Sequence, residues 1–161
     1  MSFIDEIKQS GLRQFWSKKA ASQEEIAAFE QDFAVSLPEA YKTFLAEFGC
    51  GVMGHTEIYG LGCPETGIPN VRFLINALKK QGQLFPEGVI PVSDANEGFY
   101  TCILCCSAGR FGAGSVVVCR PGDSVENARK TMQLLSKNFE EFCMMEIASQ
   151  KKESLHPPHH S

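Results

Sequence analysis

The stretch SLPEAYKTFLAEFGCG, residues 36–51, constrains the fold more than any other part of the sequence. Pro38 suits the first turn of a helix, where a missing N–H leaves no hydrogen bond unmade. Gly49 ends this helix, and the glycines after it let the chain turn at once. Between them one apolar helical face is formed by Tyr41, Phe44, Leu45 and Phe48. We therefore expect a helix that packs tightly against the segment following it.

Another helix is predicted directly before Pro38. Ser22 and Glu25 have the spacing of a capping box, and apolar residues follow at helical intervals. Because only a short link separates the two helices, they should pack as a pair. A first helix is expected near the N-terminus, with one apolar face formed by Phe3, Ile4, Ile7, Leu12, Phe15 and Trp16.

After residue 54 the pattern becomes mainly that of strands. Pro69 opens one inserted helix that ends near Gly82. From Ser124 a helical period returns, which predicts a closing helix that ends near Ser149 and is broken around Ser136. Strands are predicted over residues 55–62, 88–94, 98–107 and 115–123, with a glycine-rich hairpin tip at 108–114.

This order of elements predicts an α+β fold. We expect a single domain over residues 1–149, with a mainly antiparallel central sheet of about four to six strands. An N-terminal helix pair, one inserted helix and a C-terminal helix should surround the sheet. A length of 161 residues with 43% apolar residues suits one globular domain. Residues 150–161, polar and containing His and Pro, are predicted to form a disordered tail.

Charge and composition exclude several classes of protein. The net charge of −4, without a run of Lys and Arg, argues against a nucleic-acid-binding surface. The N-terminus MSFIDEIKQS is no secretory signal, and no stretch approaches the about 18 apolar residues of a membrane span. The seven cysteines form no disulfide framework. We expect a cytoplasmic protein that binds neither membranes nor nucleic acids.

Two cysteine pairs are candidates for chemistry. Cys102 and Cys105 have the spacing of zinc and redox sites. In a strand, however, residues three apart point to opposite faces, so we predict buried thiols without metal or disulfide. Cys50 and Cys63 flank the first predicted strand and can approach each other, although a functional thiol pair there is the less favoured interpretation. The histidines of the tail, His156, His159 and His160, are a weak metal-binding candidate in a segment expected to be solvated.

The loops around the predicted central strands carry the other candidates. Asp94 and Glu97 lie in SDANEGFY, where paired carboxylates can serve as acid and base or bind a hard cation. Asp and Asn followed by Gly between strands are more typical of a turn. The tip GRFGAG precedes a strand, whereas a phosphate-binding loop opens a helix. With no nucleophile elbow in the sequence, we predict no catalytic residues, no metal and no cofactor.

The capping-box helix is followed along the chain by LPEAYKTFL, EIYGLG, IPVSDANEGFYTCI and FEEFC. In this order the segments resemble the SUKH superfamily, which includes bacterial immunity proteins and the fungal Smi/Knr cell-wall regulators. The resemblance extends over residues 20–145. FGCGVMG replaces the usual Asn-Gly-Gly turn, and LCCS stands where members often carry an acidic residue. The structural residues of the matching segments are Pro38, Tyr41, Phe44, Leu45, Gly60, Pro91 and Gly98.

The resemblance implies a compact, non-catalytic protein-binding domain. Bacterial members of this type usually neutralise a polymorphic or contact-dependent toxin, often a nuclease, by stoichiometric binding. The implied partner is a cognate toxin domain, and an acidic face would attract a basic toxin. A regulatory or scaffold domain in signalling is the alternative, and an enzyme or metal-binding protein is the third. We expect the contacts at loops on the sheet edge, at Asp94, Asn96, Glu97, Arg110 and Phe111.

Overall fold

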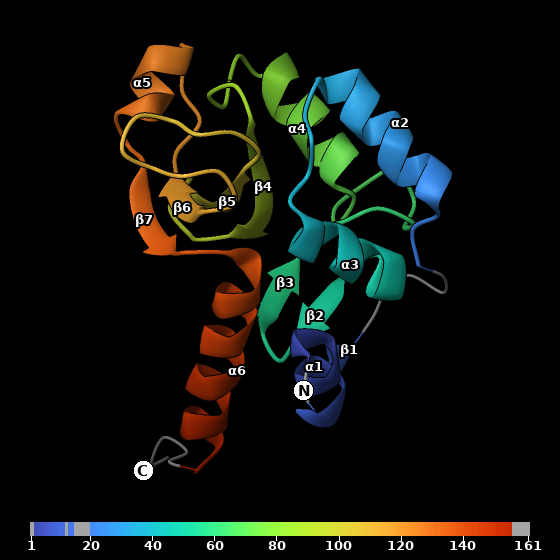
Figure 1. Ribbon diagram of the computed structural model, residues 1–161. Helices are drawn as coiled ribbons and strands as arrows, with labels where there is room; N and C mark the ends of the chain where they lie inside the picture. The colour runs from blue at the N-terminus through green and yellow to red at the C-terminus, as the bar shows by residue number, and fades with distance from the viewer. Residues whose placement is uncertain (1, 12, 15–19, 156–161) are drawn as a thin grey trace.

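Two antiparallel sheets with helices packed around them make up the computed structural model, which describes residues 2–11, 13–14 and 20–155 (Figure 1). The helices are α1 Phe3–Gln9, α2 Gln23–Phe33, α3 Glu39–Phe48, α4 Val71–Lys80, α5 Val125–Arg129 and α6 Phe139–Leu155. The strands are β1 Arg13–Gln14, β2 Gly51–Met53, β3 Thr56–Ile58, β4 Val89–Asp94, β5 Tyr100–Leu104, β6 Val116–Cys119 and β7 Gln133–Ser136. This arrangement confirms the predicted α+β class.

The larger sheet has the order β4-β5-β6-β7, and the smaller has the order β1-β2-β3. The register of β4 on β5 shifts between Pro91 and Ser93. At this irregularity the Val92 carbonyl accepts a 2.7 Å hydrogen bond from the backbone N–H of Tyr59, just beyond β3. The two sheets are therefore joined at one edge of β4. Pro91, which has no N–H to donate, lies where the ladder is already irregular.

The helix pair forms as its sequence predicts. Ser22 and Glu25 make both hydrogen bonds of the capping box at the start of α2. Helix α3 follows Pro38, and its four apolar stripe residues are all buried. Gly60 lies so close to the end of α3 that an added Cβ would be 1.7 Å from the Gly49 carbonyl oxygen. The glycines after α3 therefore permit a close approach of two backbone segments.

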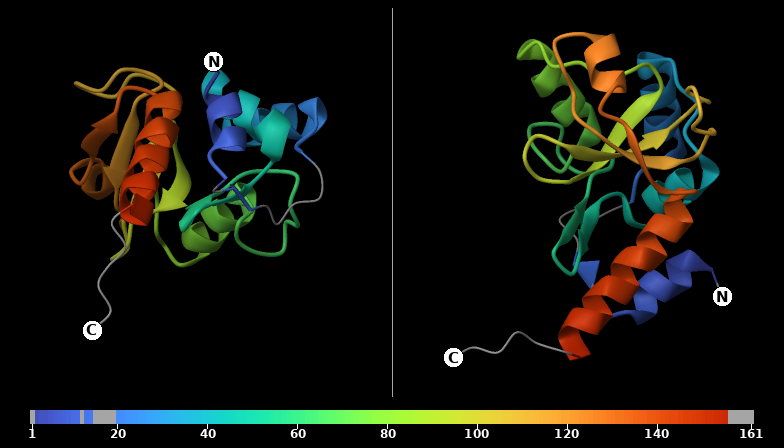
Figure 2. Two further views of the ribbon diagram at one scale, coloured as in Figure 1. Left: turned by 90° about the horizontal axis from the view of Figure 1, so that it is seen from below. Right: turned by 90° about the vertical axis from the view of Figure 1, so that its left-hand side faces the viewer.

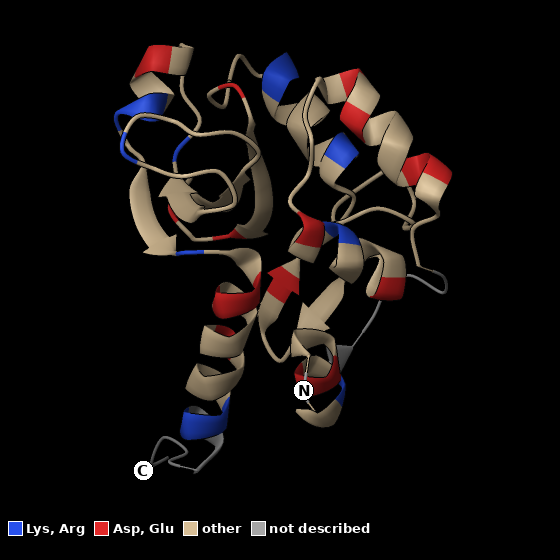
Figure 3. Cartoon of the chain, viewed as in Figure 1, with Lys and Arg blue, Asp and Glu red and all other residues tan. Residues whose placement is uncertain are grey.

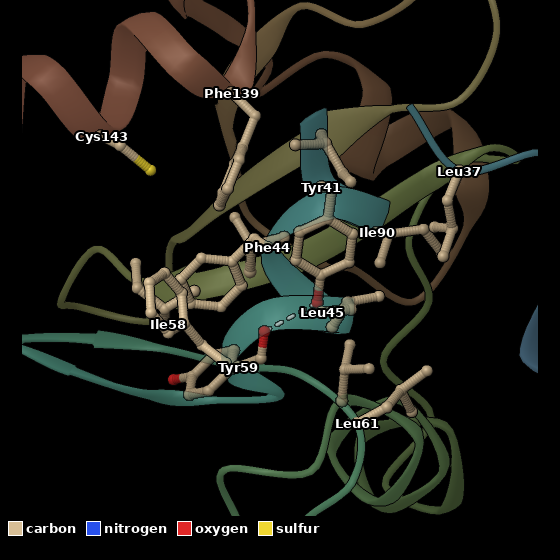
Figure 4. Packing of buried hydrophobic residues seen from close by; sticks show 14 of the residues in the cluster. Leu37, Tyr41, Phe44, Leu45, Ile58, Tyr59, Leu61, Ile90, Phe139 and Cys143 are labelled. Atoms are coloured by element: carbon tan, nitrogen blue, oxygen red, sulfur yellow. Dashed lines mark hydrogen bonds between the residues drawn. The ribbon is translucent and has the colours of Figure 1, made fainter. Parts of the chain in front are cut away.

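A main core fills the space between the larger sheet and helices α2, α3, α4 and α6. Side chains of α3 and α6 meet there, and the Phe139 ring lies 5.3 Å from the Tyr41 ring and 5.6 Å from the Phe44 ring (Figure 4). The buried Tyr41 hydroxyl donates a 2.7 Å hydrogen bond to the Tyr59 carbonyl. A second, smaller cluster covers the opposite face of the sheet and consists of Val89, Cys102, Leu104, Val117, Cys119, Ala128 and Met132.

The predicted closing helix from Ser124 is wrong in its first half. The short helix α5 leads into strand β7, which pairs antiparallel with β6, and only then does α6 begin. The spacing of Met132, Leu135 and Phe139 fits a helix, but the free edge of β6 offers backbone hydrogen bonds that outweigh this local preference. The strand β7 thus forms the far edge of the larger sheet.

The predicted boundaries at both termini also differ from the structure. Helix α1 ends at Gln9 and the chain turns at Gly11, whose φ of +72° favours glycine. Leu12, Phe15 and Trp16 lie outside the described residues, as do the tail histidines. Helix α6 continues to Leu155 rather than ending near Ser149, so the predicted disordered segment begins too early.

Helix α6 extends away from the larger sheet and alongside α1 (Figure 2). The Phe3 ring of α1 lies 6.2 Å from the Phe139 ring, so the N-terminal helix shares the main core. No helix among the described residues is both long and apolar enough to cross a membrane.

Candidate functional site, an acidic cleft

The turn between β4 and β5 has an unusual backbone. Asn96, Glu97 and Gly98 have φ values of 72°, 57° and 83°, a conformation that costs free energy for residues other than glycine. The Asp94 carboxylate accepts a 3.2 Å hydrogen bond from the Asn96 N–H, and the Phe99 N–H donates to the Asn96 carbonyl at 3.0 Å. The turn is therefore held in place by its own polar groups, as the sequence predicts.

This turn packs against the end of the neighbouring strand β6. A Cβ at Gly98 would lie 3.4 Å from the Arg120 side chain, and the Arg120 guanidinium lies 5.9 Å from the centre of the Phe99 ring. This packing fixes the orientation of the turn. Asp94, Asn96 and Glu97 all remain exposed.

Asp94 and Asn96 line a cleft of about 290 Å³ where the smaller sheet, the β4–β5 hairpin and α6 meet. In Figure 3, Asp and Glu positions gather where β3 faces the upper part of α6. We call this site the acidic cleft because three carboxylates line it. Its lining residues are His55, Thr56, Glu57, Ser93, Asp94, Asn96, Thr101, Phe142 and Glu146.

Hydrogen bonds fix the walls of the acidic cleft. Thr56 Oγ1 donates to Glu146 Oε2 at 2.8 Å, which joins β3 to α6. Ser93 Oγ donates to the Glu57 carbonyl at 2.6 Å, which joins β4 to β3. The cleft is therefore a preformed feature of the fold.

Gln150 connects α6 to the hairpin formed by β2 and β3. Its side chain donates to the Met53 carbonyl at 2.7 Å and accepts from the His55 N–H at 3.1 Å. The sequence interpretation missed this residue because it placed the end of the helix at Ser149. The buried spacing of Cys143 and Ile147 continues to Gln150, and this pattern was the available signal.

One carboxylate of the acidic cleft, that of Glu57, has a raised pKa. Burial raises the pKa of Glu57, and the nearby Asp94 carboxylate raises it further. Burial also raises the pKa of Tyr59 and of Tyr100, with Asp94 adding to both shifts. In the described part of the chain, no Lys or Arg forms an ion pair with Glu57, Asp94 or Glu146. The cleft thus collects negative charge that these residues do not neutralise.

The other two predicted contact residues lie elsewhere. Arg110 and Phe111 belong to the β5–β6 loop, where the guanidinium is 5.1 Å from the phenyl ring centre and Phe111 packs against the second cluster. The turn at Asp94 precedes β5 and this loop follows it, so the two groups are at opposite ends of the strand. The five predicted contact residues therefore do not form a single site.

The cysteines take the places that strand geometry predicts. Cys102 is buried in the second cluster, whereas Cys105 packs against the main core on the other face. Burial raises the pKa of both thiols, that of Cys105 to about 12. Cys50 and Cys63 do approach each other, and a hydrogen bond with Cys50 lowers the pKa of Cys63. In the described residues, no group of three His, Cys, Asp or Glu side chains is arranged to hold a metal ion.

The sequence model of the SMI1 / KNR4 family (SUKH-1) matches residues 20–145. The chain belongs to the SMI1 / KNR4 family (SUKH-1). The match runs from just before the capping box of α2 into α6 and includes every carboxylate of the acidic cleft except Glu146. SUKH-1 domains are commonly protein-interaction modules.

A solved structure described as a protein from Pseudomonas syringae pv. tomato is similar to this SUKH-1 domain in fold. The TM-score is 0.53 at 15% sequence identity, over 72% of this chain and 80% of that chain. At this identity the likeness concerns the fold alone. A comparison with curated proteins finds no match.

Proposed function

We propose that this SUKH-1 chain is a non-catalytic immunity protein in the cytoplasm, which neutralises a cognate toxin domain by stoichiometric binding. The observation that carries the proposal is the acidic cleft, which Glu57, Asp94 and Glu146 line without an ion pair to a Lys or Arg of the described residues. Such a concentration of negative charge favours a partner with basic side chains. A nuclease, which needs basic residues to hold its substrate's phosphates, is the toxin class that fits.

The hydrogen bonding inside the cleft supports a binding role, because its hydroxyl groups join neighbouring elements of the fold. Ser93 Oγ donates to a backbone carbonyl, and Thr56 Oγ1 donates to Glu146. These two hydroxyl groups therefore stabilise the walls of the cleft through their hydrogen bonds. The cleft offers fixed hydrogen-bond acceptors to a partner.

The surroundings of the cleft provide further contact area. Glu97 is exposed on the turn above it, and Met144 and Met145 are exposed on α6 next to Glu146 in sequence. Methionine side chains adapt to the shape of a partner and are enriched in interfaces. An inhibitory complex of standard size would bury about 1,600 Å² in total, which requires these surfaces as well as the cleft.

Co-expression with the C-terminal domain encoded by the adjacent gene tests the proposal. We expect cells that express both proteins to survive and the two proteins to elute as a 1:1 complex in gel filtration. The variant Asp94→Arg should reduce protection, because it reverses a charge at the cleft while the side chain is exposed. Glu126→Arg, on the exposed surface of α5, is the matched control. A toxic neighbour that kills equally fast with and without this protein would overturn the immunity role.

A further inference from the structure

We propose that Cys50 and Cys63 form a modification site, at which a small hydroperoxide converts the two thiols into a reversible disulfide. Neither residue lines the acidic cleft, and the inference does not depend on the proposed function. Cys50 lies directly before β2 and Cys63 lies beyond β3, yet their side chains share a hydrogen bond. Both are buried, with exposed fractions of 0% and 6%.

The backbone brings the two thiols together. The Leu61 N–H donates a 3.2 Å hydrogen bond to the Gly49 carbonyl, so the segments that carry the thiols run side by side. Gly62, with a φ of 86°, then turns the chain. After this turn the Cys63 thiol donates to the Gly60 carbonyl at 3.9 Å. The proximity of the two thiols is therefore fixed by the path of the main chain.

Asn70 holds the Cys63 side of the pair. It is 1% exposed, and its side-chain Nδ2 donates to the Cys63 carbonyl at 3.1 Å. The Oδ1 atom of the same side chain accepts from the Phe73 N–H at 3.1 Å, which caps helix α4. Cys63 is thus anchored to a helix while its thiol meets that of Cys50.

Cys63 is the thiol that should react first. The hydrogen bond with Cys50 lowers the pKa of Cys63, against the opposing effect of burial. Cys63 also retains some exposure, whereas Cys50 has none. The thiolate is the form that attacks a peroxide, so a lowered pKa favours this residue. Burial instead raises the pKa of four other thiols, those of Cys102, Cys105, Cys119 and Cys143.

The reaction has two steps. The Cys63 sulfur attacks one oxygen of hydrogen peroxide, the O–O bond breaks, and a sulfenic acid and one water form. The Cys50 sulfur then attacks the Cys63 sulfur, the S–O bond breaks, and a second water leaves. The two thiols together lose two electrons and two protons, which the peroxide takes up.

The disulfide would close residues 50–63 into a ring that contains the β2–β3 hairpin. Oxidation would therefore tie this hairpin to the segment that leads into α4. In reducing compartments, disulfides that form and break in this way are typical of redox sensing. A thiol such as dithiothreitol would restore the reduced pair by exchange.

Peptide mapping of the full chain tests the site. The reduced protein is treated with one equivalent of hydrogen peroxide, and N-ethylmaleimide in denaturant at mildly acidic pH blocks the remaining thiols. We expect one dominant product by mass spectrometry, in which the peptides of Cys50 and Cys63 are linked and two hydrogen atoms are lost. Dithiothreitol should reverse it. A chain whose Cys50 and Cys63 stay blocked by the maleimide, or whose main disulfide is Cys102–Cys119, would overturn the proposal.

Two variants identify the order of the steps. Cys50→Ser removes the second thiol, so dimedone, which traps sulfenic acids, should label Cys63 after peroxide treatment. In Cys63→Ser the linked product should be lost and Cys50 should remain unlabelled. Dimedone on Cys50 of the Cys63→Ser chain would overturn the assignment of Cys63 as the attacking thiol.

Cys106→Ser is the matched control, because this thiol is exposed and lies away from the pair in the β5–β6 loop. It should leave the yield of the linked product unchanged. A linked product that disappears in Cys106→Ser would mean that the exposed thiol reacts first and passes the oxidation on, which would refute direct reaction at Cys63. The mapping of the original chain needs no substitution, so it decides the proposal even if a variant fails to fold.

Discussion

At the scale of single residues, Gly60 lies where the end of α3, the segment after β3 and the start of α4 meet. Its carbonyl accepts a 2.9 Å hydrogen bond from Val71 at the start of α4, and an added Cβ would be 1.7 Å from the Gly49 carbonyl oxygen. A backbone atom cannot rotate away as a side chain can. We predict that Gly60→Ala lowers the free energy of unfolding by about 3 kcal/mol or more, measured by urea unfolding.

The matched control for this substitution is Gly67→Ala. An added Cβ at Gly67 meets no atom within 4 Å. We expect the free energy of unfolding to change by about 0.5 kcal/mol at most. Similar losses of unfolding free energy in both variants would show that the close approach at Gly60 does not determine the stability of the fold.

Glu57 gives a residue-scale prediction about pH. Burial and the Asp94 carboxylate raise its pKa above the ordinary value of 4.5, so the folded protein binds the proton more tightly than the unfolded chain does. Ionisation therefore reduces stability as the pH rises from about 4.5 through the raised pKa. We predict that Glu57→Gln increases the free energy of unfolding at pH 7 and that this gain disappears near pH 4.

Urea unfolding at the two pH values measures this effect, with Glu126→Gln controlling for the loss of one negative charge. A Glu57→Gln protein less stable than the original at pH 7 would mean that the carboxylate supports the fold. A residue that lowers stability while it faces a binding site is a common compromise in functional proteins.

At the scale of elements, the second half of α6 depends on Gln150. This side chain is buried and bonds to Met53, His55 and Thr56 across the β2–β3 hairpin. We predict that Gln150→Ala costs about 1–3 kcal/mol, because it removes the buried hydrogen bond to the Met53 carbonyl. Hydrogen exchange at the His55 amide should accelerate in this variant.

Ser149→Ala is the matched control, since this neighbouring side chain is exposed on the same helix. It should leave the exchange of the His55 amide unchanged. Exchange that is equally slow in the Gln150→Ala protein would show that the hairpin keeps its structure without α6.

Elements with strong local signals could be predicted from the sequence, and those decided by distant partners could not. The capping box at Ser22 and the stripe behind Pro38 involve residues a few positions apart, so the pattern is visible locally. The segment of strand β7 has a helical sequence pattern. It forms a strand because it pairs with the edge of β6, about 15 residues earlier in the chain. The acidic cleft also combines residues that are distant in the chain, so the sequence indicates only part of it. Asp94 and Asn96 stood out in a turn motif, whereas Glu57 and Glu146 join them only through folding.

At the scale of the whole molecule, the acidic cleft lies where the main structural parts meet. The smaller sheet reaches the larger one through the Tyr59–Val92 hydrogen bond, and α6 passes both. A partner that fills the cleft would contact all three parts at once. Its binding free energy would add to the stability of the entire fold, because only the folded state assembles the site.

The close approach at Gly60 also limits which substitutions such a protein can accumulate during evolution. Position 60 accommodates only a hydrogen atom as its side chain. A substitution there therefore destabilises the fold, whether or not it affects the binding of a partner. Asp94, in contrast, is exposed and contributes its carboxylate only to a turn and to the cleft. Lineages can therefore alter the charge pattern of the cleft in small steps while they inherit the same scaffold. A domain built in this way can change its binding surface while it keeps its fold.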